Sequence, residues 1–174
     1  MNGFLQENPC IVAGSTWQED EAVLVPYINA LDSPAKFIIA PHNIKYGAIK
    51  KLTTRLKKKT VCFSSLEGTA IPKDTEVFIL DTIGLLTKIY SYADIAYVGG
   101  GFATGLHNTL EPAVFGVPVL IGPHYTQFKE AEDLVAAGGI LSIDSQEGFK
   151  AEMDSLLESE EKRATVGRIN KNYV

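Results

Sequence analysis

The run 97–124 of this chain gathers residue types that could bind a nucleotide. Three consecutive glycines, at 99–101, directly follow an apolar segment, where a strand must turn sharply and let a ligand approach the backbone. Asn108 and Glu111 stand at the beginning of an expected helix, and a further apolar strand follows. Ligands of open α/β sheets bind at the carboxyl ends of strands, against the N-termini of helices. The run therefore predicts a nucleotide-binding site.

Apolar segments alternate with amphipathic segments along the 174 residues, a length that suits one domain. Strands are expected at residues 10–14, 36–40, 60–63, 76–80, 94–98, 117–121 and 139–143. Helices are expected at 19–31, 45–58, 83–92, 127–137 and 146–157, and a charged tail closes the chain. Strands that are apolar throughout belong to sheets covered on both faces. The pattern therefore predicts an α/β fold, a single Rossmann-like, doubly wound domain over residues 1–174 with a mainly parallel sheet of about six strands.

Polar or glycine-rich residues follow five of the expected strands. The five groups are 14–16 (GST), 41–43 (PHN), 81–84 (DTIG), 99–101 (GGG) and 122–124 (GPH). Because parallel strands present their carboxyl ends at the same edge of a sheet, we expect these five loops to lie together along that edge. Their convergence is a more specific sign of a binding site than any single motif.

Several of these polar residues also have a purely structural interpretation. Ser15 or Thr16 could cap the helix that follows the first strand, although a cap and a phosphate contact use the same helix end. Asp81 and Thr82 could likewise cap the helix that follows them. The basic stretch 55–59 is expected to be a solvated helix end, where cations suit the helix dipole, with a contact to anionic lipid or phosphate as the alternative.

Asn108 and Glu111 have the spacing of a capping box. With Asn108 as the N-cap, Pro112 would fall at the fourth helical position, where its missing N–H removes the first intrahelical hydrogen bond. That imperfect fit weakens the purely structural interpretation and leaves a ligand-binding role open. For His107 and His124 a structural role is favoured over a catalytic one, since histidine often satisfies a hydrogen bond in a loop.

Composition and missing motifs argue against several classes of protein. The net charge of -5 gives no general attraction to nucleic acid, and no stretch approaches the ~20 apolar residues that cross a bilayer or forms a signal peptide. Cys10 and Cys62 lie in apolar strands and are expected to be buried, reduced thiols in a cytosolic environment. Three histidines without regular spacing make a poor metal site, and neither a Walker lysine nor a nucleophile elbow is present. We therefore expect no metal, no cofactor and no covalent catalysis.

The motifs resemble those of the C-terminal half of bacterial 3-deoxy-D-manno-octulosonic acid (Kdo) transferase, a glycosyltransferase of the GT-B fold that modifies lipid A. The matching segments are AGST (13–16), IIAPH (38–42), DTIG (81–84), YVGGGF (97–102), GLHNTLEPAVFGVPVLIGPH (105–124) and FKEAEDLVAAGG (128–139). The resemblance covers nearly the whole chain, and the segment 107–124 is highly specific. Two positions depart from the family pattern, because the usual Arg after the AP dipeptide is His42 and the usual Glu after DTxG is Leu85. The first departure leaves undecided which residue replaces the arginine as a contact to the phosphate. The candidates are His42, Asn43 and Lys45.

The resemblance implies an enzyme of two Rossmann-like halves with its active site in the cleft between them. The C-terminal half binds the donor, CMP-Kdo. The N-terminal half carries the acidic catalytic base, the site for the lipid A precursor and the attachment to the cytoplasmic face of the bacterial inner membrane. The chain is therefore expected to be the donor half alone, a soluble domain of an enzyme of lipopolysaccharide biosynthesis, with no catalytic residue and no metal. As an excised domain it is expected to fold but to transfer no sugar.

The expected donor-binding residues combine the strand-end loops with the motifs of the resemblance. They are Ser15, Thr16, Pro41, His42, Ile83, Gly84, Gly100, Gly101, Asn108 and Glu111. An anionic phosphate suits hydroxyls and the N–H groups of a glycine turn, and a carboxylate such as Glu111 accepts well from ribose hydroxyls. Asn108 can donate to phosphate and accept from the sugar, and backbone groups near Ile83 and Gly84 can read the cytosine edge.

Two alternatives to this assignment stay open on the sequence. One is the donor domain of another GT-B transferase that uses a UDP-sugar, and the other is a non-catalytic nucleotide-binding module with a doubly wound fold. A receiver-like regulatory domain is disfavoured, because the segment 13–16 lacks the acidic cluster that such a domain needs after its first strand. Nucleotide titration distinguishes the Kdo transferase assignment from these two alternatives. Preference for CMP would support the Kdo transferase, preference for UDP the other transferase, and absence of nucleotide binding the non-catalytic module.

Overall fold

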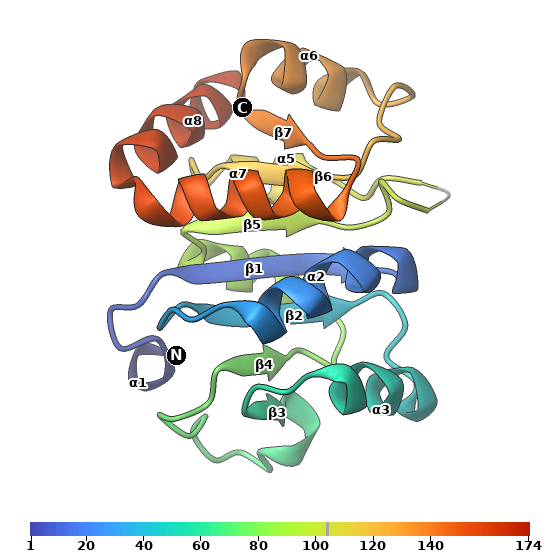
Figure 1. Ribbon diagram of the computed structural model, residues 1–174, viewed down its shortest axis with the longest axis vertical. Helices are drawn as coiled ribbons and strands as arrows, with labels where there is room; N and C mark the ends of the chain where they lie inside the picture. The colour runs from blue at the N-terminus through green and yellow to red at the C-terminus, as the bar shows by residue number, and fades with distance from the viewer. Residues whose placement is uncertain (104) are drawn as a thin grey trace.

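A seven-stranded parallel sheet forms the centre of the molecule in the computed structural model, which describes residues 1–103 and 105–174 (Figure 1). The strands are β1 (Cys10–Thr16), β2 (Lys36–Pro41), β3 (Thr60–Cys62), β4 (Val77–Ile79), β5 (Ile95–Val98), β6 (Val119–Ile121) and β7 (Ile140–Ser142). Neighbouring strands are parallel throughout, and their order is β3-β4-β2-β1-β5-β6-β7. The predicted doubly wound fold is confirmed, and a strand is present in each of the seven expected segments, against the expected count of about six in the sheet. Thr104, in the glycine-rich run, lies outside the described residues.

Helices cover both faces of the sheet (Figure 1). The helical elements are α1 (Asn2–Leu5), α2 (Gln18–Ala30), α3 (Tyr46–Arg55), η1 (Phe63–Ser65), α4 (Leu86–Ile89), η2 (Tyr90–Tyr92), α5 (Leu110–Ala113), α6 (Lys129–Ala137), α7 (Gln146–Glu158) and α8 (Glu160–Tyr173), of which η1 and η2 are 3-10 turns. The helices α2, α3 and α7 pack with one set of strand side chains into a hydrophobic core, and α1, α4 and α6 pack with the other set into a second core. Helix α8 packs against α5, α6 and α7.

Strand β1 shows why these segments are apolar at every position. Ile11 and Ala13 belong to the core that contains α2, whereas Cys10 and Val12 belong to the core on the opposite face. Successive side chains of a strand point to opposite faces, so a strand covered on both faces buries all of them. All four side chains are indeed buried. The continuous apolar pattern is therefore the direct sign of a sheet with helices on both sides.

The two cysteines differ in burial. Cys10 is buried, and this burial, together with the charge of Asp94, raises the pKa of its thiol to about 12. Cys62 lies on the edge strand β3 and is only half-buried, so the expectation of two buried thiols is wrong for Cys62. Both thiols are free. The strand pattern around Cys62 does not show whether its strand lies at the centre or at the edge of the sheet, and burial depends on that position.

The expected charged tail is in fact the helix α8. Its N-cap is Ser159, whose hydroxyl accepts a hydrogen bond from the backbone N–H of Lys162 at 3.0 Å. Near the other end, the buried Asn170 donates from Nδ2 to the carbonyls of Val117 and Gly139, both at 2.7 Å. The sequence hides this helix because its buried strip holds an asparagine among few apolar residues, which leaves little of the usual amphipathic pattern.

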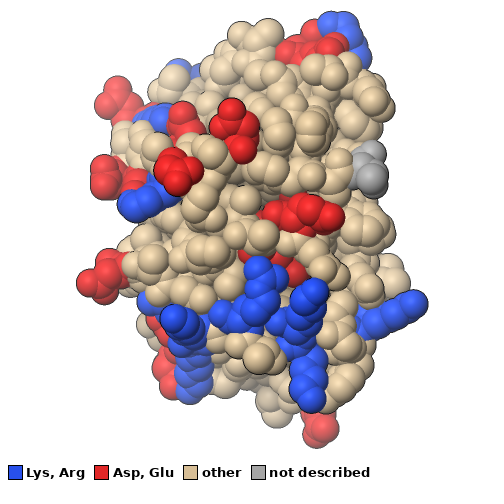
Figure 2. Space-filling model, turned by 45° about the vertical axis from the view of Figure 1, so that its right-hand side comes forward, with Lys and Arg blue, Asp and Glu red and all other residues tan. Residues whose placement is uncertain are grey.

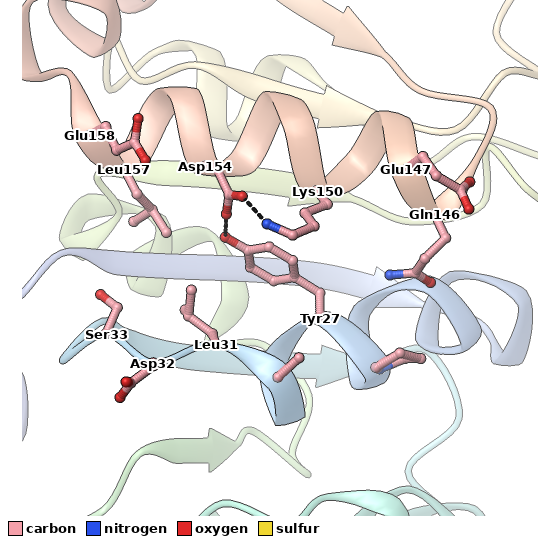
Figure 3. A pocket seen from close by; sticks show the side chains of 12 residues that line it. Tyr27, Leu31, Asp32, Ser33, Gln146, Glu147, Lys150, Asp154, Leu157 and Glu158 are labelled. Atoms are coloured by element: carbon pink, nitrogen blue, oxygen red, sulfur yellow. Dashed lines mark hydrogen bonds and ion pairs between the residues drawn. The ribbon is translucent and has the colours of Figure 1, made fainter.

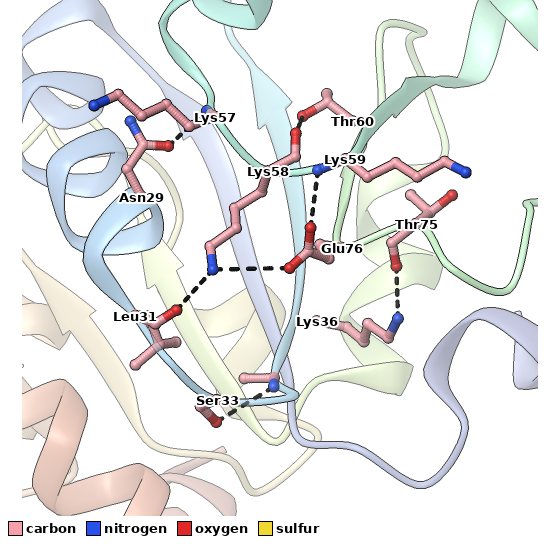
Figure 4. A network of polar contacts seen from close by, with 11 residues as sticks. Asn29, Leu31, Ser33, Lys36, Lys57, Lys58, Lys59, Thr60, Thr75 and Glu76 are labelled. Atoms are coloured by element: carbon pink, nitrogen blue, oxygen red, sulfur yellow. Dashed lines mark hydrogen bonds and ion pairs between the residues drawn. The ribbon is translucent and has the colours of Figure 1, made fainter.

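The basic stretch 55–59 is not a solvated helix end, because α3 stops at its first residue. Lys58 Nζ donates to the carbonyl of Leu31, the C-cap residue of α2, at 2.8 Å and lies 3.8 Å from Glu76 Oε1 (Figure 4). The backbone N–H of Lys59 donates to Glu76 Oε2 at 2.9 Å. Through the Lys58 side chain and the Lys59 backbone, this stretch joins the end of α2 to the segment before β4, while the side chains of Lys57 and Lys59 are exposed.

Candidate functional site

The loops after the strands meet at the carboxyl edge of the sheet, as predicted. The loops after β1 and β2 join where the backbone N–H of His42 donates to the Thr16 carbonyl at 2.9 Å. The loops after β5 and β6 join where the backbone N–H of His124 donates to the Gly101 carbonyl at 2.9 Å. Strands β1 and β5 are neighbours, and the order of the chain along the sheet changes direction between them. Open α/β sheets bind their ligands at such a switch point.

The glycine turn after β5 allows the neighbouring loops to come close. Gly100 has a φ of 96°, in the left-handed region that favours glycine, and a Cβ at this position would lie 2.0 Å from the Gly105 carbonyl oxygen. A Cβ at Gly99 would lie 2.2 Å from the carbonyl oxygen of Ser15. The backbone N–H of Gly100 donates to Asp20 Oδ2 at 3.0 Å, so this donor is already used within the protein.

Asp20 holds the glycine turn against the start of α2. Its carboxylate accepts from Tyr97 Oη at 2.6 Å, from the backbone N–H of Gly100 at 3.0 Å and from the backbone N–H of Trp17 at 2.8 Å. Burial raises the pKa of Asp20, and the three hydrogen bonds oppose that rise. The sequence analysis missed this residue. An acid three positions after the residue that precedes a helix is half of a capping box, and that spacing could have indicated it.

The last residues of β1 contain an unusual backbone conformation. Ser15 has a φ of 53°, and the pairing of β1 with β2 is shifted between Gly14 and Thr16. Neither Ser15 nor Thr16 caps α2, whose N-cap is Trp17, so the capping interpretation is wrong. Thr16 is buried and donates from Oγ1 to Glu21 Oε1 at 3.2 Å. Ser15 is therefore the more accessible hydroxyl of the two expected phosphate ligands.

Glu111 and its hydrogen-bond partners, Thr87 and Asn108, form a second part of the candidate site. Thr87, on α4, donates from Oγ1 to Glu111 Oε2 at 3.1 Å, and Asn108 Nδ2 lies 3.5 Å from Glu111 Oε1. Asn108 Oδ1 accepts from the backbone N–H of Leu110 at 3.0 Å, and the N-cap of α5 is Thr109. The capping-box interpretation is therefore wrong. The structure instead brings the side chains of Asn108 and Glu111 together, and Glu111, in the first turn of α5, also contacts Thr87 of α4.

The loop after β4 presents an apolar side chain to the outside. Asp81 accepts hydrogen bonds from the backbone and the hydroxyl of Ser64, so it does not cap the following helix. Thr82 does not cap it either, because the N-cap of α4 is Leu85. Ile83 is 84% exposed, and Gly84 has a φ of 87°. An exposed isoleucine beside a glycine turn offers a flat surface for a planar ligand group.

Trp17 and two histidines lie between these loops. Trp17 Nε1 donates to His107 Nε2 at 3.0 Å, and the ring of His42 stacks on the Trp17 indole. Burial lowers the pKa of His107, and the neighbouring His42 lowers it further. His42 follows the buried Pro41 and is itself exposed. The sequence analysis did not name Trp17, although this single tryptophan directly follows one of the five loops.

Another cavity lies away from these loops. A groove of about 640 Å³ runs between α2 and α7, and in it Tyr27 Oη donates to Asp154 Oδ1 at 2.7 Å (Figure 3). A second cavity, of about 510 Å³, lies at the strand ends, lined by Ala103, Gly105, Pro123, His124, Thr126, Gln127 and Phe128. The second cavity adjoins the converging loops, so we place the candidate site there and on the loops around Glu111 rather than in the larger groove.

The charged surface around the site is uneven. Lys and Arg side chains gather on the lower half of the face shown in Figure 2, and the exposed lysines on and before α3 include Lys45, Lys50 and Lys51. Across residues 1–103 and 105–174, no group of three or more His, Cys, Asp and Glu side chains is arranged to hold a metal ion. Within the same residues, no helix has the length and apolar character to cross a membrane.

Known proteins resemble the chain in sequence. No family model matches it. It is 33% identical over 162 residues to the 3-deoxy-D-manno-octulosonic acid transferase of Chlamydophila psittaci, an alignment that covers 91% of the chain and 37% of the relative. It is 32% identical over 174 residues to the protein of the same name from Haemophilus influenzae, with 93% and 39% covered. The chain thus spans less than two fifths of the length of these curated relatives.

A solved structure resembles the chain in fold. The crystal structure of the C-terminal CMP-Kdo binding domain of WaaA from Acinetobacter baumannii matches 98% of the chain and 93% of that domain, with a TM-score of 0.83 and 23% identity. This likeness confirms the Rossmann-like architecture that the sequence predicts.

Proposed function

The chain belongs by sequence to the family of the Kdo transferases, and on that premise we propose that it is the part of such an enzyme that binds the donor CMP-Kdo. The observation that carries the proposal is the Glu111 carboxylate, which Thr87 and Asn108 hold at the edge where the strand-end loops converge. A half-buried carboxylate with oriented oxygens is suited to the hydroxyls of a ribose.

The remaining residues of the site suit the other groups of CMP-Kdo. The exposed Ile83 and the turn at Gly84 offer an apolar surface and backbone groups to the cytosine. Ser15 and His42 lie on adjoining loops, where a phosphate at the switch point can be reached from both. The polar cavity beside His124 has room for the sugar.

These contacts define what this part of the enzyme contributes to the reaction. In the transfer of Kdo, a hydroxyl of the acceptor attacks the anomeric carbon, the bond from that carbon to the phosphate oxygen breaks, and CMP leaves with the bonding electrons. The residues described here position the sugar and stabilise the negative charge on the departing phosphate. The donor carries its own activated group, so this contribution requires neither a cofactor nor a metal.

The acceptor side of the reaction belongs to the part of the protein outside this chain. We place there the binding of the lipid A precursor, the catalytic base and the association with the cytoplasmic face of the inner membrane. The purified chain is accordingly expected to transfer no Kdo. Mass spectrometry of a lipid A precursor incubated with the chain and CMP-Kdo measures this directly. A product heavier by one Kdo would contradict the proposal that the acceptor site and the catalytic base lie outside this chain.

Calorimetric titration with CMP and with UDP tests the donor assignment. We expect saturable binding of CMP and at least tenfold weaker binding of UDP, since UDP differs from CMP both in its base and in its second phosphate. Preference for UDP would indicate a transferase that uses another nucleotide-sugar. Absence of binding by both nucleotides to a folded chain would contradict the proposed function.

A further inference from the structure

The groove between α2 and α7 has a largely apolar lining. The residues that supply it are Pro26, Ala30 and Leu31 of α2, Leu157 of α7 and the ring of Tyr27, which points from α2 toward α7 (Figure 3). The groove lies on the face of the sheet that α2 and α7 cover together with α3. With a volume of about 640 Å³, it has room for a large side chain of another molecule.

The charged residues around this groove are mostly acidic. Four acids and one base line it, and the base, Lys150, forms an ion pair with Asp154. The other three acids, Asp32, Glu147 and Glu158, are exposed and make no ion pair among the residues that the structure describes. An apolar groove with such a rim suits a partner that presents an apolar side chain among positive charges.

Helix α3 presents a surface of that kind. The stretch 45–59 contains seven Lys and Arg residues and no acid. Lys45, Lys50 and Lys57 are exposed, and within the described part of the chain they have no ion-pair partner. Tyr46, in the first turn of α3, is 79% exposed, and Lys50 Nζ lies 5.9 Å from the centre of its ring. Exposed tyrosines of this kind are common at the centres of protein interfaces.

The groove and the basic surface lie on opposite sides of α2. Helices α7, α2 and α3 cover the same face with α2 in the middle (Figure 1). The side chain of Asn29 joins α2 to the end of α3, because its Oδ1 accepts from the backbone N–H of Lys57 at 2.8 Å. The outer side of α2 carries small exposed residues, Ala22, Pro26 and Ala30, which allow another helix to come close. A two-fold axis along α2 would therefore place α3 of one copy over the groove of the other.

We propose that this face binds a second copy of the chain, in a symmetric dimer in which Tyr46 of each copy enters the α2–α7 groove of the other. The three unpaired lysines of each α3 then meet the three unpaired acids of the opposite groove, and the contact is made twice in each dimer. Pairing of α3 with α3 would bring like charges together and is disfavoured. The inference is independent of the proposed function, because it uses a face of the sheet and not the carboxyl edge.

Sedimentation velocity at increasing concentrations of the chain tests the dimer. We expect a dissociation constant of about 10–100 µM, because exposed ion pairs are individually weak. Tyr46→Ala should raise this constant at least about tenfold and Tyr46→Phe should change it little, since the ring is the part that enters the groove. A wild type that stays monomeric at about 1 mM would overturn the proposal. Assemblies that grow beyond the dimer would contradict the two-fold arrangement, because only a closed symmetric contact stops at two copies.

Charge reversal tests which surfaces meet. Lys50→Glu and Glu158→Lys should each raise the dissociation constant at least about tenfold, because each change acts twice in the dimer. An equimolar mixture of these two variants should dimerise again. In the mixed dimer the two reversed side chains face each other, and the second contact keeps both native residues. A mixture that stays monomeric would show that α3 does not pair with the groove.

Matched controls separate this pairing from a general effect of charge. Lys88→Glu on α4 and Glu132→Lys on α6 make the same changes in net charge on helices of the opposite face, and both should leave the dissociation constant unchanged. Thermal melts confirm that the compared variants are folded. Equal weakening by the controls would contradict the assignment of the interface to this face. A monomeric wild type whose groove binds a basic amphipathic peptide would assign the groove to another protein instead of a second copy.

Discussion

Two carboxylates near the carboxyl edge of the sheet, Asp20 of α2 and Glu111 of α5, differ in how their oxygens are used. Asp20 is fully buried and accepts three hydrogen bonds, from Tyr97, Gly100 and Trp17. Glu111 is half-buried and is approached by one hydroxyl and one amide. The two side chains lie on the same edge of the sheet and have the same chemistry. Burial and the number of donors around them therefore separate a residue that holds the fold from one that can hold a ligand.

The comparison shows how the site is built. Asp20 ties the loop after β5 to the start of α2, and this bond sets where the glycine turn lies. Glu111 is oriented from one side by Thr87 and Asn108, which leaves acceptor capacity on its oxygens. We therefore propose that Asp20 is a positioning group and that Glu111 is a recognition group. The four changes below test this distinction.

The largest effect is expected from Asp20→Ala. The change leaves the buried Tyr97 hydroxyl and the N–H of Gly100 without their partner, which should lower the free energy of unfolding by roughly 3–5 kcal/mol. Urea denaturation measures this loss. Asp94→Ala is the matched control, because Asp94 accepts from the backbone N–H of Cys10 but is itself exposed, and about 1 kcal/mol is expected. Equal losses in the two variants would contradict the structural role of Asp20.

Glu21, next to Asp20, should make stability depend on pH. Burial raises the pKa of Glu21 from its ordinary 4.5 to about 7, against the effects of Thr16 and Arg55. Between these two values the unfolded chain loses the proton and the folded chain keeps it, so the free energy of unfolding falls as pH rises through this window, by up to about 3 kcal/mol. In Glu21→Gln the titrating carboxyl is absent, so this dependence of the free energy of unfolding on pH should disappear.

Denaturation at about pH 5 and pH 8 measures the effect of Glu21. We expect Glu21→Gln to be more stable than the wild type at the higher pH and close to it at the lower pH. The reverse order would show that the Glu21 carboxylate is stabilised as an anion by Arg55, 4.0 Å away, more than burial disfavours it.

Glu111→Gln should weaken CMP binding without unfolding the chain. A carboxylate that accepts from ribose hydroxyls makes charge-assisted hydrogen bonds, and its neutralisation should cost about 1.5–3 kcal/mol of binding. Calorimetry with CMP and a thermal melt measure the two quantities together. Glu161→Gln, on the exposed surface of α8, is the control and should change neither. Unchanged affinity for CMP would remove Glu111 from the donor site.

The smallest effect is expected from Asn108→Ala. The change removes the acceptor for the backbone N–H of Leu110 and the amide that faces Glu111, and it should lower the free energy of unfolding by roughly 1 kcal/mol. CMP binding should weaken less than in Glu111→Gln, because the carboxylate remains and Thr87 still holds it. A loss of affinity larger than that of Glu111→Gln would assign the main contact to Asn108.

The site was only partly predictable from the sequence. The convergence of the loops followed from the parallel sheet, and Asn108 and Glu111 were expected to be close because they are three residues apart. Asp20 and Tyr97 are 77 positions apart in the chain, and Trp17 and His107 are 90 apart. No local pattern connects residues at such separations. The interpretation of Asn108 and Glu111 as a capping box also failed, because a pattern of spacing does not show at which residue a helix begins.

The sequence by itself determined the parallel sheet, the edge at which the loops meet and the family, because strand period and motif are properties of neighbouring residues. Only the tertiary structure decided which carboxylate is buried, that the final segment is a docked helix and that Trp17 joins two histidines. These features depend on side chains that are brought together by packing. The energy of such contacts comes from burial and from hydrogen bonds between distant segments, which exist only once the sheet has formed.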